Sequence, residues 1–181
     1  MISHQHKCIF IHIPKCAGTS VEKVFEHFSE HQGRGGQDHR SIRMIEQPWL
    51  TINSIGSVEN IEELLRRYKY QTNKKINPKS RQTVTAKQYE EYFKFTVVRN
   101  PWARAHSWYK NVIKDPVHLK QYNITSDIEF NEFLKRFVPT SYPLRQQVYW
   151  LKNFSGKIDL DYIGRFEEIE KVFENIADQL N

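Results

Sequence analysis

The stretch KCIFIHIPKCAGTS, residues 7–20, decides the fold. Residues 7–13 form a short apolar and β-branched run that ends at Pro14, which is typical of a buried strand with a sharp exit. The apolar residues that follow have helical spacing: Val21, Val24, Phe25 and Phe28. The stretch therefore predicts a strand, a loop and a helix in that order.

A second unit of the same kind lies in the middle of the chain. Residues 93–98, FKFTVV, predict a strand, and Pro101 suits the first turn of a helix that continues to Val112. Strands alternating with helices predict one α/β domain, with a mostly parallel sheet and helices on both faces. Ligands of such sheets bind beyond the carboxyl ends of the strands, so both loops should open on the same edge.

Weaker patterns predict the other elements. Helical spacing predicts a helix over residues 60–70, while residues 38–45 fit one or two helical turns or a loop. Ser126 and Glu129 match a capping box in front of a helix over residues 130–137. The C-terminal part predicts a helix over 144–152, a strand over 162–164 and a helix over 167–180 that turns Ile169, Val172, Phe173 and Ile176 inward.

Length and composition set the class of protein. The 181 residues fit a single domain, and 39% hydrophobic with 13% aromatic residues exclude a disordered chain. We expect a soluble cytoplasmic protein, because there is no membrane-length apolar run and no signal-peptide pattern in the first residues. The two cysteines, Cys8 and Cys16, have no zinc or redox spacing, and we predict no metal site.

The charge is unevenly distributed. The net charge of +6 favours anionic partners and leaves nucleotides, nucleic acid and acidic glycans open. Residues 64–89 contain eight basic and no acidic residues, within a basic insertion of uncertain structure at about 48–85. With Tyr68, Tyr70 and Tyr89 this segment could serve a nucleic-acid-binding module, although such a run is usually a solvated face.

The loop over residues 14–20 has the parts of an anion site. The following helix offers unpaired N–H groups, Gly18 permits close backbone approach, and Lys15 adds a full charge. Thr19 and Ser20 add hydroxyl donors. The loop is not a Walker A sequence, because Lys15 precedes Gly18. The alternative is a plain turn in which Lys15 is solvated and the hydroxyls only cap the helix.

The loop after the second strand supplies another cation. Arg99 ends the strand, and Ser107 lies about two turns along the helix. A guanidinium can hold a phosphate by two parallel hydrogen bonds, with a hydroxyl completing the site. Arg104 could act similarly, but we expect a structural role for it.

Three blocks of sequence carry a family resemblance. IHIPKCAGTS (residues 11–20) resembles the 5′-phosphosulfate loop of sulfotransferases that use 3′-phosphoadenosine 5′-phosphosulfate (PAPS). FTVVRNPWARAHSWY (95–109) is similar to their 3′-phosphate motif, and IGRFE (163–167) to their C-terminal signature. The branch is that of heparan sulfate 2-O-sulfotransferase and its bacterial relatives. The blocks span nearly the whole chain, and the resemblance implies a P-loop-like fold.

The resemblance also implies roles for individual residues. Lys15 would contact the bridging oxygen of PAPS, and residues Cys16, Ala17, Gly18, Thr19 and Ser20 would surround its 5′ end. Arg99 and Ser107 would hold the 3′-phosphate, and Phe166 would lie beside the adenine. His39 would be the base that activates the acceptor hydroxyl, with an ordinary pKa near 6.5.

The chain departs from the family pattern in places. Cys16 and Ala17 replace the Thr-Gly often seen in bacterial members, and residues 48–81 contain no alignable motif. The Golgi members begin with a membrane anchor that is not evident here. Of the other histidines, His12 reads as a packed strand residue, and His4 and His6 as part of a mobile terminus.

The sequence thus predicts sulfuryl transfer from PAPS to a hydroxyl, with a carbohydrate as the favoured acceptor. A lipid-linked sugar, a peptide tyrosine or a small alcohol would also fit. The alternative is a nucleotide kinase-like phosphoryl transferase, which would need a GK[ST] signature and an acidic Mg²⁺ ligand that are not evident.

Overall fold

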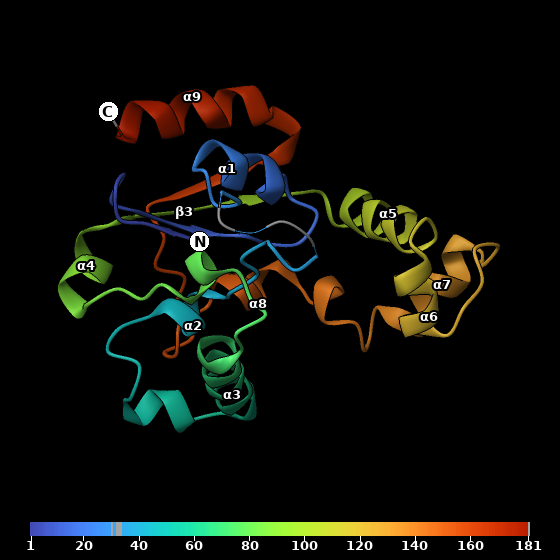
Figure 1. Cartoon of the computed structure of the whole chain (residues 1–181), viewed down its shortest axis with the longest axis horizontal. Coiled ribbons are helices and arrows are strands. Elements are labelled where there is room, and N and C mark those ends of the chain that lie inside the picture. The colour runs from blue at the N-terminus through green and yellow to red at the C-terminus, as the bar shows by residue number, and fades with distance from the viewer. Residues whose placement is uncertain (30, 32–33, 181) are drawn as a thin grey trace.

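The protein is built on a four-stranded sheet with the order β1-β2-β3-β4 (Figure 1). The computed structural model describes residues 1–29, 31 and 34–180. The strands are β1 (Ile2–Ser3), β2 (Cys8–Ile11), β3 (Phe93–Val98) and β4 (Tyr162–Arg165). β1 pairs antiparallel with β2, whereas β2, β3 and β4 are parallel. The predicted mostly parallel sheet is confirmed.

The helices are α1 (Gly18–Val24), α2 (Ile42–Ile45), α3 (Val58–Thr72), α4 (Ala86–Glu91), α5 (Pro101–Val112), α6 (Pro116–Tyr122), α7 (Phe130–Phe137), α8 (Gln147–Leu151) and α9 (Ile169–Leu180). Short 3₁₀ turns are η1 (Ile52–Ile55), η2 (Pro78–Arg81), η3 (Tyr142–Leu144) and η4 (Phe166–Glu168). None of the helices in the described part of the chain is long and apolar enough to span a membrane.

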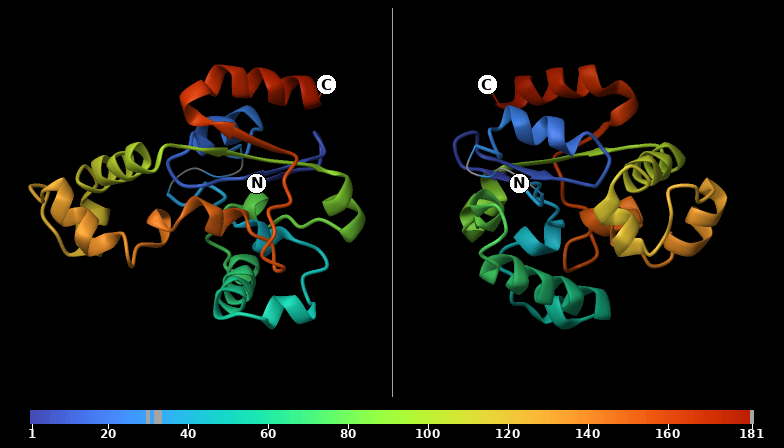
Figure 2. Two further views of the ribbon diagram at one scale, coloured as in Figure 1. Left: turned by 180° about the vertical axis from the view of Figure 1, so that it is seen from behind. Right: turned by 45° about the vertical axis from the view of Figure 1, so that its right-hand side comes forward.

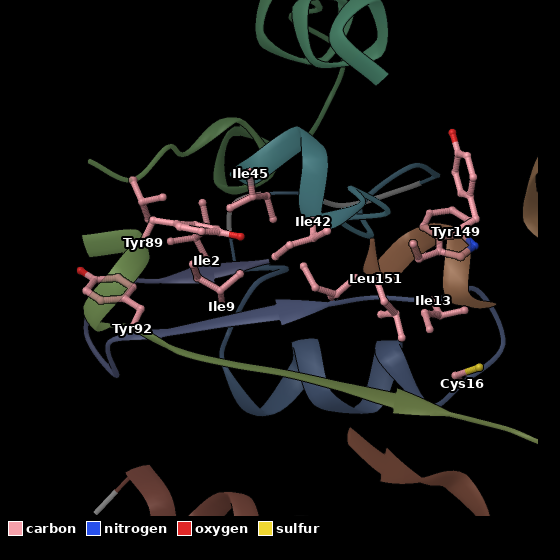
Figure 3. Close-up of a cluster of buried hydrophobic side chains, with 13 residues drawn as sticks. Ile2, Ile9, Ile13, Cys16, Ile42, Ile45, Tyr89, Tyr92, Tyr149 and Leu151 are labelled. Atoms are coloured by element: carbon pink, nitrogen blue, oxygen red, sulfur yellow. The ribbon is translucent and has the colours of Figure 1, made fainter. Parts of the chain in front are cut away.

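Helices cover both faces of the sheet, as predicted. Figures 1 and 2 show α1 and α9 on one face, α2, α4 and α8 on the other, and α5–α7 as a lobe beside it. Successive residues of β2 point to opposite faces, and all four are buried because both faces are covered. Cys8 and Phe10 pack with α1 and α9. Ile9 and Ile11 pack against the residues of α2, α4 and α8 shown in Figure 3.

The N-terminus differs from the mobile segment expected from sequence. Ile2 and Ser3 form the edge strand β1, and Ile2 is buried. The Met1 ammonium donates to the carbonyl of Phe10 at 2.7 Å and lies 3.1 Å from the Asp38 carboxylate. His4 also has a partner, because its Nδ1 lies 2.9 Å from the Tyr92 hydroxyl.

Several predicted boundaries are wrong. No capping box starts α7, whose N-cap is Glu129 without a side-chain hydrogen bond. The expected helix over 144–152 is divided into η3 and α8, and the expected last helix begins with η4. The sequence interpretation also missed α4 and α6, which are short. The helix expected at residues 60–70 is confirmed as the longer α3.

Candidate active site

A cavity of about 790 Å³ opens at the carboxyl ends of β2 and β3. It lies where the two predicted loops meet, as expected for a parallel sheet. The cavity brings together nearly all of the predicted site residues: Lys15, Ala17, Gly18, Thr19, Ser20, His39, Arg99, Ser107 and Phe166.

Cys16 is the predicted site residue that does not line the cavity. Its side chain is buried in the core (Figure 3), and its Sγ donates to the Gln147 Oε1 at 3.4 Å. Its backbone N–H donates to the carbonyl of Ile13. The side chain of Cys16 therefore does not face a ligand in the cavity, because the loop turns it inward.

The β2–α1 loop requires a glycine at one position. A Cβ on Gly18 would lie 1.9 Å from Cδ2 of His12, so a larger residue would displace the His12 ring. Lys15 and Ala17 both have left-handed backbone conformations, with φ of 68° and 62°. The loop is thus held in a tight, strained turn around the buried His12.

Two cations, Lys15 and Arg99, face this cavity. Lys15 Nζ donates to the Asn111 Oδ1 at 3.4 Å, and Arg99 Nη1 donates to the Lys15 carbonyl at 3.2 Å. Among the described residues, neither cation pairs with a carboxylate. Burial lowers the pKa of Lys15, and the nearby positive charge of Arg99 lowers it further. Two adjacent positive charges in a partly enclosed cavity favour an anionic ligand.

Arg99 is held in place by Phe166 and Gln147. Its guanidinium lies 4.0 Å from the centre of the Phe166 ring, a cation–π contact. The Arg99 N–H donates to Gln147 Oε1 at 2.8 Å, and Gln147 Nε2 donates to the Arg99 carbonyl at 2.7 Å. The Arg99 Nε is buried without a partner in the described structure. Nothing in the sequence pattern indicated the role of Gln147.

The comparison with known families agrees with this geometry. The model of the sulfotransferase family matches residues 1–181. The chain belongs to the sulfotransferase family. It is therefore an enzyme of sulfuryl transfer, and the match favours this over the phosphoryl-transfer and nucleic-acid alternatives. Searches of curated proteins and of solved structures gave no match.

Two histidines of the sulfotransferase line the cavity with their rings in contact, tilted at 55°. The rings of His12 and His39 are 4.2 Å apart, and His39 Nδ1 lies 3.4 Å from the His12 carbonyl oxygen. A carbonyl can only accept, so Nδ1 of His39 carries the proton and Nε2 keeps its lone pair. Burial, followed by His12, lowers the pKa of His39 to about 3, which corrects the ordinary value expected from sequence.

A second wall of the cavity, which includes Arg34 and Asp115, was not predicted. Arg34 donates two hydrogen bonds to Asp115, at 2.6 and 2.7 Å. His118 Nδ1 lies 3.0 Å from the same carboxylate. Trp108 and Asn111 complete this wall. Arg34 and Asp115 are 81 residues apart, so no local pattern could reveal the pair.

Two other residues of α5, Arg104 and His106, do not line the cavity. Arg104 is buried and donates to the backbone carbonyls of Pro14, Pro143 and Arg145, which confirms a structural role. His106 is exposed and packs edge-on against Phe130, outside the cavity. Within the described residues, no group of three His, Cys, Asp or Glu side chains could hold a metal ion.

Proposed function

We propose that this sulfotransferase moves the sulfuryl group of PAPS to a hydroxyl of a carbohydrate. The observation that carries the proposal is the pair of cations, Lys15 and Arg99, which lie in one cavity and have no carboxylate partner within the described part of the chain. A donor with phosphate groups at both ends of its ribose needs two cationic positions. The two strand ends supply one each.

The residues present fit such a donor. The buried Nε of Arg99 lacks a partner, and a phosphate oxygen would satisfy it. Ser107 on α5 lines the same cavity and can offer its hydroxyl to the same group. The Phe166 ring keeps the guanidinium in place on one side, which leaves its other donors for the ligand.

Lys15 and His39 have separate roles in the proposed transfer. PAPS, when bound, supplies the sulfuryl group and leaves as 3′-phosphoadenosine 5′-phosphate. Lys15 stabilises negative charge that develops on the leaving oxygen. His39 Nε2 accepts the proton of the acceptor hydroxyl as the new oxygen–sulfur bond forms. The lowered pKa keeps His39 neutral at physiological pH, and it also makes the imidazole a weaker base than an exposed histidine.

The second wall of the cavity supports a carbohydrate as acceptor. It combines the Trp108 ring with the polar groups of Gln37, Asn111 and Asp115. An aromatic face with a few hydrogen-bonding groups is a suitable lining for a polyhydroxylated ligand. The wall lies in the same cavity as Lys15, so an acceptor there would reach the donor site.

The test of the donor site is an Arg99→Ala variant. By calorimetry, the parent should bind 3′-phosphoadenosine 5′-phosphate far better than AMP, because Arg99 and Ser107 recognise the extra phosphate. The variant should lose most of this preference. Arg136→Ala, which removes an exposed arginine on α7, is the matched control and should leave it intact. A preference that survives in Arg99→Ala would contradict the proposal.

The test of the base is a His39→Ala variant. We expect nucleotide affinity close to that of the parent and a turnover lower by about 10²–10⁴-fold. Because the pKa of His39 is about 3, the parent's rate should stay level between pH 5 and 7. A His39→Ala variant that keeps the parent's turnover would contradict the assignment of the base.

A further inference from the structure

The helix α3 faces the protein with its polar side. Asn60, Glu63 and Arg67 are buried, with Glu63 fully so. Four apolar side chains of the same helix lie in solvent, with exposed fractions between 44% and 75%: Val58, Ile61, Leu65 and Tyr68. An amphipathic helix normally buries its apolar side, so this arrangement leaves an apolar face without a partner in the monomer.

Hydrogen bonds hold α3 in this orientation. The Glu63 carboxylate accepts from Tyr149 Oη at 2.5 Å and also from the Ser41 hydroxyl. Asn60 accepts from Arg43 at 2.9 Å, and Arg67 donates to the Glu46 carbonyl at 2.8 Å. Rotation of the helix to bury its apolar side would leave these groups unsatisfied. The apolar face therefore stays outside.

The exposed residues are spaced for packing against another helix. Val58, Ile61, Leu65 and Tyr68 follow each other at intervals of three, four and three residues, the a and d spacing of a heptad. The neighbouring segment adds further exposed apolar side chains: Leu50, Ile52 and Ile55. Figures 1 and 2 show α3 and η1 at one end of the molecule, away from the sheet, where a second molecule can approach.

The charges along α3 indicate which helix packs against its exposed apolar residues. Its first half carries Glu59 and Glu62, which pair with Arg43 and Arg145 of the same chain and still expose 63% and 47% of their side chains. Its second half with the residues after it exposes Lys69, Lys74 and Lys75. An antiparallel copy of α3 places the acidic half of one helix beside the basic half of the other. An anionic membrane would attract the lysines and repel the glutamates of the same face.

We propose that α3 is the interface of a homodimer, in which the helices of two copies pack antiparallel about a two-fold axis. Such an interface is isologous: the same patch on each subunit covers the other. The apolar seam and the exposed lysines of α3 then have partners. The proposal does not depend on the identity of the donor or acceptor.

The first test is the oligomeric state of a Leu65→Glu variant, measured by sedimentation velocity over a concentration series. The parent should form a dimer, and the variant should be monomeric with an unchanged circular dichroism spectrum, because Leu65 is exposed in the monomer. Val24→Glu is the matched control, since Val24 is 71% exposed on α1, and it should remain dimeric. A parent that is monomeric throughout would overturn the proposal.

A charge exchange tests the antiparallel arrangement. Lys69→Glu and Glu62→Lys should each weaken the dimer about 2–10-fold, because each places like charges together. The double variant should dimerise more tightly than either single variant but more weakly than the parent, because Glu62→Lys also removes the carboxylate that pairs with Arg145 in the same chain. A double variant weaker than both single variants would overturn the antiparallel arrangement. Binding of the monomer to phosphatidylserine vesicles that is lost in Leu65→Glu would assign the face to membranes instead and overturn the dimer.

Discussion

The helices α3 and α9 have similar sequence patterns and opposite orientations. α9 buries Val172 and Ile176 against the sheet, with its charged residues in solvent. α3 buries Asn60, Glu63 and Arg67 and exposes its apolar residues. Periodicity identifies both segments as helices, but it does not decide which side faces the protein. In α3 the buried partners decide this, because Ser41, Arg43 and Tyr149 offer hydrogen bonds to polar side chains.

The difference between α9 and α3 should be largest when one isoleucine of each helix is replaced by alanine. Ile176→Ala in α9 should lower the free energy of unfolding by about 2–5 kcal/mol, because it leaves a cavity under the sheet. Ile61→Ala in α3 should change it by less than about 0.5 kcal/mol, because Ile61 is exposed in the monomer. Urea denaturation at low protein concentration measures both. Equal losses would mean that α3 also buries its apolar side.

A glutamate from each helix tests whether the polar side of α3 is the buried one. Glu63→Ala in α3 should cost about 2–3 kcal/mol, because Ser41, Tyr149 and Arg66 lose their buried acceptor. Glu174→Ala in α9 should have almost no effect, because Glu174 is exposed. The same denaturation experiment compares the two. A stable Glu63→Ala protein would show that hydrogen bonds do not orient α3.

The pH dependence of stability gives the smallest expected effect. His27 Nε2 lies 2.9 Å from the Ser80 hydroxyl in η2, after α3, and burial lowers the pKa of His27 to about 4. The unfolded chain therefore binds a proton between pH 6.5 and 4 that the folded chain does not. Stability from this group is complete above pH 6.5 and is lost as the pH falls towards 4.

The measurement compares the parent with His27→Gln, whose side chain does not titrate. Between pH 7 and 5 the parent should lose about 1–2 kcal/mol more than the variant in the free energy of unfolding. Ile176→Ala should lose as much as the parent over this range, because it removes no titrating group. Parallel curves for the parent and His27→Gln would contradict a lowered pKa of His27.

Much of the site could be predicted from the sequence, because its residues come directly after strands in the chain. Lys15 and Arg99 come just after buried runs, and parallel strands bring such loops to one edge. His39 lies within the cavity through its contact with His12, 27 residues earlier. Its lowered pKa was not predictable, because burial among packed groups is the cause.

The sequence by itself determined the α/β class, the two cationic loops and the existence of the long helices. These properties are local, because hydrophobic spacing and turn residues act within a few positions of the chain. Only the tertiary structure decided that α3 faces inward with its polar side. It also decided that Gln147 holds Arg99, and that Arg34 meets Asp115 across the cavity. Such contacts depend on which distant polar groups the folded chain brings within hydrogen-bond distance, and a buried polar group needs a partner wherever the fold provides one.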